Sequence, residues 1–411
     1  MRAGPLTHPS FRWLVAARTT AILGNAIAPL ALAFAVLDLT GSPTDLGLVV
    51  AARSIANVAV LLVGGVMADR LPRNIVLVGT SIGAALTQGI VAALVITGSA
   101  TIPLLVIFSV INGALAAMSL PASSALVTQT VPSEQLRPAN AILRLSVNAG
   151  SIVGASLGSV LVAIFGPGYG FAIDAGTFLL AAVLFACLRL HPRPDAPNAS
   201  SGDQRASVFH DLLTGWREFT RRRWVWIVVL QFMLVNAAFT GAIAVLGPIV
   251  ADATFGRASW GLVLASETVG FVLGGLIALH WRPRHALGIG VALTGMTAVP
   301  VMLLAVVPQV PVLIATFFLG GMAVEQFGIA WDQSLQQNIP ADRLSRVYSY
   351  DAAFSFIAIP VGQISVGPLA GNFGTTPVLV GCAIIILVSS LAAAAPSVRR
   401  LTSNPNTTPT P

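Results

Sequence analysis

The 411-residue sequence is poor in charge: only 9% of its residues are Asp, Glu, Lys or Arg, and none is lysine. Soluble globular chains are about a quarter charged, so this one lacks the polar residues needed to cover a water-facing surface. That scarcity excludes a cytosolic enzyme and a soluble binding module. The chain has only two cysteines, Cys187 and Cys382, and both lie inside apolar segments. They support neither a disulfide framework nor a metal site.

Motifs of catalysis are missing as well. The sequence contains no G-x-x-x-x-G-K-[ST] phosphate loop, no H-E-x-x-H, no C-x-x-C and no G-x-S-x-G. All five histidines fall in polar connections: His8, His191, His210, His280 and His285. The net charge of +7 comes from arginines that do not cluster with aromatic residues, which argues against nucleic-acid binding. We therefore expect no enzymatic activity, no cofactor, no metal and no nucleic-acid partner.

Long apolar runs are what the chain does contain: 55% of its residues are hydrophobic and the mean hydropathy is +0.85. A helix needs roughly 20 apolar residues to cross a bilayer. Twelve runs of about that length are predicted to do so: 14–37, 46–68, 75–97, 102–127, 139–165, 170–188, 225–250, 260–279, 286–307, 312–335, 347–369 and 377–395. The fold class predicted is an all-α membrane protein with twelve transmembrane helices.

The arginines predict the orientation of these helices. Eighteen of the 22 lie in the N-terminus, the even-numbered connections or the C-terminus, whereas the opposite connections hold only Arg257. Positively charged loops face the cytoplasm. We therefore expect a multi-pass protein of the cell membrane with both termini in the cytoplasm.

A polar segment, residues 189–224, divides the helices six and six. It predicts an N-terminal bundle (1–188), a cytoplasmic linker ending in an amphipathic helix on the membrane surface (189–224), a C-terminal bundle (225–400) and a disordered tail (401–411). At an offset of 208 residues, Gln129, Pro132, Gly154 and Phe165-Gly166 match Gln337, Pro340, Gly362 and Phe373-Gly374. This register indicates two pseudo-symmetric six-helix bundles with parallel repeats.

Residues 64–73, GGVMADRLPR, resemble the G-x-x-x-D-R-x-G-R signature of the major facilitator superfamily. In that family the segment forms a tight cytoplasmic loop and a gate. The resemblance implies that Gly65 permits close helix approach, that Asp69 meets a helix N-terminus or an arginine, and that Arg70 and Arg73 anchor to phosphates or acids. Pro72 replaces the family's second glycine, and the corresponding GGLIALHWRPR of the second half has no acid.

The segment from residue 120 to 158 is similar to the helix 4 to helix 5 region of one efflux subgroup of that superfamily. Its members export tetracyclines, macrolides and catecholate siderophores. Gly150, Gly154 and Gly158 recur on one face of helix 5. They indicate either a packing seam of small residues or the glycine-rich motif that limits leak between the bundles of antiporters. Ala155 stands where that motif has proline.

Ionisable side chains within predicted spans are functional candidates, because each costs several kcal/mol unless paired or hydrated. They are Arg18, Arg53, Arg144, Asp174, Glu267, Glu325, Asp332 and Asp351. We expect Arg53 to pair with Asp174 or Asp38 near the outer side. Arg18 and Arg144 lie at the depth of Asp332 and Asp351, which predicts cross-bundle ion pairs near the inner side.

A proton-coupled carrier needs a buried carboxyl that loads and unloads a proton. Glu325 is the deepest acid and the first candidate, followed by Glu267 and Asp174. The alternative is a carboxyl that only hydrogen-bonds a neighbouring helix. The nearby Gln326, Phe327 and Trp331 either line a pocket for an aromatic or cationic substrate or are packing residues.

The resemblance implies a secondary active transporter that exports an amphipathic small molecule by alternating access, with proton antiport. Its expected partners are the substrate, protons and membrane lipids, and the expected state is a monomer. Two alternatives stay open: a nutrient importer of the same fold, and a non-transporting membrane scaffold or sensor.

Overall fold

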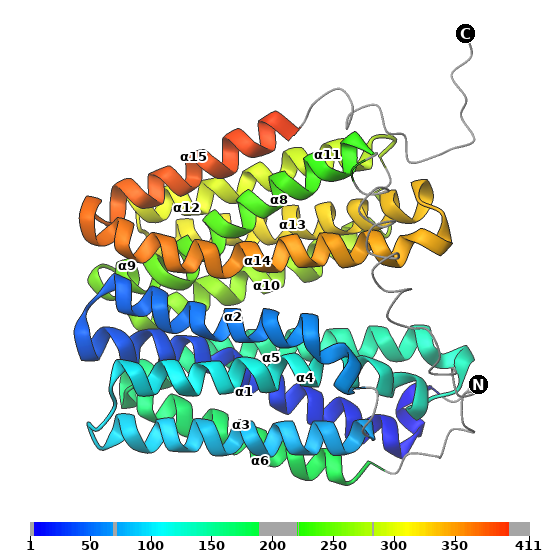
Figure 1. Ribbon diagram of the computed structural model, residues 1–411, viewed down its shortest axis with the longest axis horizontal. Coiled ribbons are helices and arrows are strands. Elements are labelled where there is room, and N and C mark those ends of the chain that lie inside the picture. Colours follow the sequence, from blue (N-terminus) through cyan, green and yellow to red (C-terminus); the bar gives the residue numbers. More distant parts are fainter. Residues whose placement is uncertain (1–3, 69–71, 189–219, 221, 282, 394–411) are drawn as a thin grey trace.

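A computed structural model of the chain shows long helices that lie side by side (Figure 1). It describes residues 4–68, 72–188, 220, 222–281 and 283–393. Within these ranges, 12 helical segments are long and apolar enough to cross a membrane. The predicted number of spans is confirmed. The predicted amphipathic helix of the linker and the tail lie outside the described residues.

The first six spans are single helices: α1 (Pro9–Thr40), α2 (Pro43–Ala68), α3 (Arg73–Ile96), α4 (Ile102–Thr130), α5 (Leu136–Phe165) and α6 (Pro167–Ala186), with short 3-10 turns η1 (Pro5–Thr7) and η2 (Ser133–Gln135) before α1 and α5. In this bundle α1 packs on α5 and α6, α2 on α4, and α3 on α4 and α6. Each of these helices extends at least two residues beyond its predicted apolar run at one end or both, because a helix continues into the polar boundary of a membrane.

The second bundle repeats this arrangement with two interrupted spans. It consists of α8 (Arg223–Gly241), η3 (Ala242–Leu246), α9 (Gly247–Ala253), α10 (Arg257–Ala278), α11 (Ala286–Thr294), η4 (Gly295–Thr297), α12 (Ala298–Val306), α13 (Val310–Asn338), α14 (Ala341–Phe373) and α15 (Thr375–Ala393). Here α8 packs on α14 and α15, α10 on α13, α11 on α13, and α12 on α15. These pairings correspond to those of the first bundle, so the predicted pseudo-symmetric pair of six-helix bundles is confirmed.

A proline follows each interruption within three residues. η3 is a π-helical turn in which the Gly247 N–H donates to the Ala242 carbonyl, just before Pro248. Proline has no N–H and its ring clashes with the carbonyl four residues earlier, so the helix widens there. The 3-10 turn η4 likewise stands just before Pro300. The seventh span is therefore α8–η3–α9, and the ninth is α11–η4–α12.

The two faces of the molecule differ in how the bundles meet. We call the face where α1 begins the terminal face, and the one where α1 joins α2 the opposite face. In the half nearer the opposite face, one hydrophobic core contains residues of both bundles, such as Leu30, Leu46, Trp260 and Phe317. In the terminal half each bundle has a core of its own. The bundles are thus joined near the opposite face and separate near the terminal face.

Glycines at matching positions explain the internal repeat. Gly154 on α5 lies against the Leu23 carbonyl of α1, and Gly362 on α14 lies against the Ala237 carbonyl of α8. Gly166 and Gly374, which end α5 and α14, both have a φ of 89°. Side chains are strained in that conformation, so glycine is required.

Replacing Gly362 with alanine is expected to lower the free energy of unfolding by about 1–3 kcal/mol, because the new methyl group overlaps the Ala237 backbone. Gly328→Ala on α13 is the matched control, since nothing lies within 4 Å of its added methyl group. It should be neutral or stabilise by up to about 1 kcal/mol. Thermal unfolding of the purified variants in one detergent measures both. Equal midpoints would contradict close packing at Gly362.

Candidate functional site

A cavity of about 420 Å³ lies between the two bundles, and we call it the chamber. Its walls come from α1, α2, η3, α9, α10 and α14: Pro29, Leu30, Leu32, Val50, Arg53, Ser54, Asn57, Val58, Ile243, Ala244, Pro248, Trp260, Leu264, Phe356, Ile359 and Gln363. Most of these side chains are apolar. The charged and polar ones come from α2, with Gln363 of α14 facing them from the other bundle.

A second cavity of about 270 Å³, the side cavity, extends into the first bundle. Arg53 and Asn57 line both cavities, so the two adjoin along α2. The walls of the side cavity come from α1, α2, α3, α4 and α6: Arg18, Ala21, Ile22, Asn25, Arg53, Asn57, Leu77, Thr80, Ser81, Ala84, Asn112, Leu115, Ala116, Ser119, Phe178 and Phe185. It is much more polar than the chamber.

The arginines of the side cavity hydrogen-bond to uncharged side chains. Arg53 Nη2 donates to Asn25 Oδ1 at 2.7 Å, and Arg18 donates to the Ser123 hydroxyl of α4. Asp174 on α6 is fully buried, and its Oδ2 accepts from Gln88 Nε2 at 2.5 Å. Arg53 and Asp174 are near enough to attract each other but form no direct ion pair. The predicted direct pairing of Arg53 with Asp174 or Asp38 is therefore wrong, because Arg53 bonds the Asn25 amide and Asp174 bonds the Gln88 amide.

A cross-bundle ion pair lies in the terminal half of the molecule. Arg144 Nη2 of α5 and Glu325 Oε1 of α13 are 2.7 Å apart, with side chains 71% and 17% exposed. The Glu325 side chain passes Gly274 and Gly275 of α10, and a side chain at Gly274 would crowd it. Those are the glycines of the GGLIALHWRPR segment.

Near the opposite face, Arg257 connects the bundles. Its Nη2 is 2.6 Å from Asp38 Oδ1 of α1, and its Nε is 2.6 Å from Asp252 Oδ1 of its own bundle. The guanidinium also lies 4.8 Å from the centre of the Phe34 ring of α1, a cation–π contact. Arg257 was the only arginine on that side in the sequence, and its link to Asp38 went unpredicted.

The predicted cross-bundle pairs of Asp332 and Asp351 are wrong. Asp351 accepts a hydrogen bond from Trp331 Nε1 at 2.9 Å, and Asp332 accepts one from the Tyr348 hydroxyl at 3.1 Å. Both contacts stay within the second bundle. Among the predicted arginine partners, Arg18 bonds Ser123 and Arg144 bonds Glu325 instead.

The aromatic residues of α13 are packing residues. Phe327 and Trp331 are 3% and 6% exposed and stack with their ring centres 6.4 Å apart. Phe232 and Trp224 of α8 contact them in turn. Gln326 donates to the Gly274 carbonyl at 2.6 Å. Phe327 and Trp331 therefore belong to the core of the second bundle, as the packing alternative predicted, whereas Gln326 lines a cavity.

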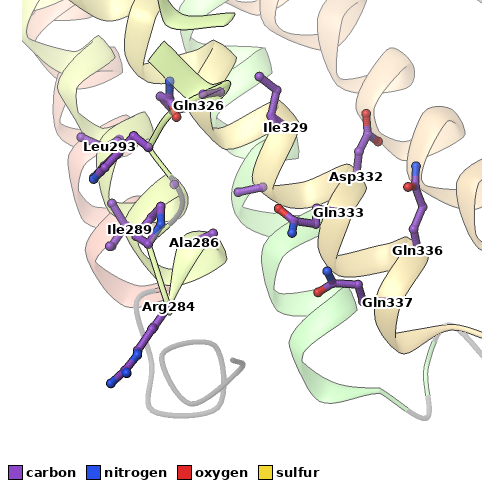
Figure 2. Close-up of a pocket in the computed structure, with 15 residues that line it drawn as sticks. Arg284, Ala286, Ile289, Leu293, Gln326, Ile329, Asp332, Gln333, Gln336 and Gln337 are labelled. Carbon is purple, nitrogen blue, oxygen red and sulfur yellow. The ribbon is translucent and has the colours of Figure 1, made fainter. Parts of the chain in front are cut away.

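A third cavity, of about 730 Å³, opens near the terminal face between α10, α11 and α13. Figure 2 shows Gln326, Gln333 and Gln337 on the side of α13 that faces Ile289 of α11, and Asp332 and Gln336 on its other side. Trp281, Arg284 and Gln336 also line it. It is a polar hollow within the second bundle, away from the chamber between the bundles.

The remaining predicted residues stay apart from the chamber walls. Glu267 lies on α10, one turn from Leu264, and its carboxylate has no hydrogen bond or ion pair to the described residues. Gly150, Gly154 and Gly158 all face α1 of their own bundle, as a packing seam does. Arg73 begins α3, whereas Asp69 and Arg70 lie outside the described residues, as does the packing of Gly65. The gate stays a prediction.

Asparagine and glutamine residues are what the sequence reasoning missed. Asn25, Asn57, Gln88 and Asn112 sit in apolar helices and line or support the side cavity. An uncharged amide inside a predicted span was the available signal, because such groups need a partner there. No group of three or more His, Cys, Asp or Glu side chains that could hold a metal occurs among the described residues.

Comparison with known proteins identifies the family. A family model described as the Major Facilitator Superfamily matches residues 14–363. The chain belongs to the major facilitator superfamily. The resemblance predicted from residues 64–73 and 120–158 is thus confirmed, and the protein is a multi-pass membrane transporter of this superfamily rather than an enzyme.

Two exporters are among its curated relatives in the superfamily. The chain is 23% identical to the multidrug efflux pump Tap of Mycolicibacterium fortuitum over 399 residues, covering 94% of this chain and 95% of the pump. It is 28% identical to the enterobactin exporter EntS of Salmonella typhi over 283 residues, which are 66% of this chain and 63% of that exporter. Both are efflux transporters.

Solved transporters have the same fold. The nucleoside transporter NupG superposes with a TM-score of 0.72 at 15% identity, over 94% of this chain and 98% of its own. A bacterial homolog of the human lysosomal transporter Spinster, in an inward-facing and unoccupied conformation, superposes with a TM-score of 0.67 at 15% identity, over 95% and 96%. At such identity the likeness concerns the fold alone.

Proposed function

We propose that this major facilitator protein exports an amphipathic small molecule from the cell in exchange for protons. The chamber is the observation that carries the proposal. It lies between the two bundles, has mainly apolar walls and is joined by a polar side cavity, as a site for an amphipathic ligand needs. The efflux relatives support the outward direction.

The two cross-bundle ion pairs provide the switch. Opening toward the opposite face requires that Arg257 leave Asp38, and wider opening toward the terminal face requires that Arg144 leave Glu325. The present structure contains both pairs. Alternate breaking of the two exposes the chamber to one face at a time. In this proposal the terminal face is cytoplasmic, residues 1–188 and 225–400 move as the two bundles, and residues 189–224 link them.

Glu325 is the proposed proton carrier. The Glu325 side chain is only 17% exposed, so when Arg144 departs its ionised carboxylate loses its partner, and binding a proton removes that cost. Protonation of Glu325 is therefore tied to the separation of the bundles. Glu267 and Asp174 are the second candidates, since neither carboxylate forms an ion pair with the described residues.

Cells that express the protein are expected to lose a lipophilic dye or antibiotic faster than empty-vector cells, and an uncoupler should abolish the difference because it removes the proton gradient. The measurement is the efflux rate for a panel of cationic, neutral and anionic dyes, with and without the uncoupler. Faster accumulation in place of loss would favour an importer. No uncoupler-sensitive difference for any compound would favour a non-transporting scaffold.

A further inference from the structure

Two arginines and no carboxylate line the adjoining chamber and side cavity. Arg18 and Arg53 are the charged residues among the described side chains that form the walls. Asp174, which attracts Arg53 without contacting it, is fully buried, accepts a hydrogen bond from Gln88 and lines neither cavity. The site that a ligand meets is therefore positively charged.

Both guanidinium groups keep hydrogen-bonding capacity for a ligand. A guanidinium has five N–H donors, yet within the described part of the chain each of these makes a single hydrogen bond, to Asn25 or to Ser123. The Nε of Arg18 is buried and has no hydrogen-bond partner among the described residues. Arginine binds a carboxylate or phosphate through two parallel bonds, and a cation in a poorly hydrated site gains from such a partner.

The position of the arginines divides the site into a polar and an apolar part. Arg53 lies where the two cavities adjoin and bonds Asn25 of α1. Arg18 lies on the same helix as Asn25, two helical turns or about 10 Å closer to the terminal face. On the other side of Arg53, the chamber offers Leu30, Trp260 and Phe356. Together the two cavities match the size of small-molecule sites, about 300–1,000 Å³.

We propose that the transported molecule is an organic anion: an apolar, aromatic body held in the chamber, with an acidic group bound by Arg53 and drawn in past Arg18. This inference rests on the proposed function in that it takes the chamber as the transport site. It specifies that the ligand is negatively charged, a property that the fold alone does not determine. A lipophilic cation would place its charge beside two arginines that form no ion pair with the described residues, and like charges repel strongly in a poorly hydrated site.

Binding of three matched probes to the purified full-length protein tests the sign. The probes are 2-naphthoate, the uncharged 2-naphthamide and the cationic 2-naphthylmethylammonium, measured by equilibrium dialysis in detergent. We expect 2-naphthoate to bind at least about tenfold more tightly than either of the others, as a charge-assisted bond to arginine predicts. Equal or tighter binding of the cation, or binding of none of the three, would overturn the proposal.

Variants assign the preference to the arginines. Arg53→Gln should weaken 2-naphthoate binding at least about tenfold and change 2-naphthamide binding by less than about twofold. Arg18→Gln should act in the same direction. Arg12→Gln, at the exposed start of the same helix, is the matched control and should bind like the wild type. An unchanged 2-naphthoate affinity in both cavity variants would contradict the assignment, and retained 2-naphthamide binding shows that the site is folded.

The result separates this proposal from the proposed function. If the protein prefers the cation and still shows uncoupler-sensitive efflux, the anion proposal is wrong and the proposed function stands. If the protein binds 2-naphthoate through Arg53 but shows no uncoupler-sensitive transport, the anion site stands and the proposed function is wrong.

Discussion

Vesicles in which Glu325 is replaced by glutamine are expected to show no proton-driven transport above that of vesicles without the protein. Glutamine cannot carry a proton, but its carbonyl still accepts a hydrogen bond from Arg144, so the contact between α5 and α13 persists. Exchange of labelled for unlabelled substrate across the membrane, which requires no net proton movement, should continue. The measurement compares uptake driven by a pH gradient with exchange at equal pH.

Asp332→Asn is the matched control, because this acid lies on the same helix and bonds Tyr348 within its own bundle. It should keep proton-driven transport. If the Glu325 variant still transports against a gradient, then another carboxyl carries the proton, and Glu267→Gln and Asp174→Asn become the decisive variants. If exchange is lost too, Glu325 acts in binding or folding instead of coupling.

The second large effect is expected at Arg257. Arg257→Gln removes the ionic contact between the bundles at the opposite face, together with the cation–π contact to Phe34. The side chains of the Arg257–Asp38 pair are 23% and 42% exposed, which limits its contribution to about 1–2 kcal/mol. Loss of that amount shifts the ratio of closed to open molecules by a factor of about 5–30.

Labelling of a chamber cysteine measures this shift. In a variant with Cys187 and Cys382 replaced, Ser54→Cys places a thiol on the chamber wall. A membrane-impermeant maleimide applied from the opposite face should react about 5–30 times faster in the Arg257→Gln background. Right-side-out and inverted vesicles identify which side that face occupies in the cell.

Asp252→Asn is the matched control for Arg257. It removes a contact of the same arginine at the same distance of 2.6 Å, but one that lies within the second bundle. The labelling rate should stay at the wild-type value or fall, since Arg257 keeps its ion pair with Asp38. Equal acceleration by both variants would mean that the local charge, and not the link between bundles, controls access.

The fold was predictable because its determinants are local. A run of about 20 apolar residues must form a helix in a membrane, where every backbone group needs a partner within the segment. The match of Gly154 with Gly362 indicated the repeat, and both now lie against backbone carbonyls of a neighbouring helix. The π-helical turn at η3 followed from Pro248 only in retrospect, because many membrane helices tolerate proline without widening.

The site was predictable only in part, because pairing depends on helix rotation. Depth alone placed Arg144 near Asp332 and Asp351. In the structure Arg144 pairs with Glu325, whose side chain passes the small glycines of α10. Depth likewise suggested that Arg53 pairs with Asp174. Instead, Arg53 bonds Asn25 and Asp174 bonds Gln88. A residue's distance along a helix can be counted from the sequence, but the direction of its side chain around the axis cannot.

The glycine contacts between the bundles have a consequence for speed. Gly47 of α2 lies on the Gln363 backbone of α14, Gly367 of α14 lies on the Pro43 backbone, and Gly261 of α10 lies on the Ala155 carbonyl of α5. At these three contacts the backbones of the two bundles approach closely, so movement at these points requires little change of side-chain rotamers. In the proposed cycle the ion pairs determine which conformation is populated, and we expect these glycine contacts to lower the barrier between conformations and so to shorten the turnover time.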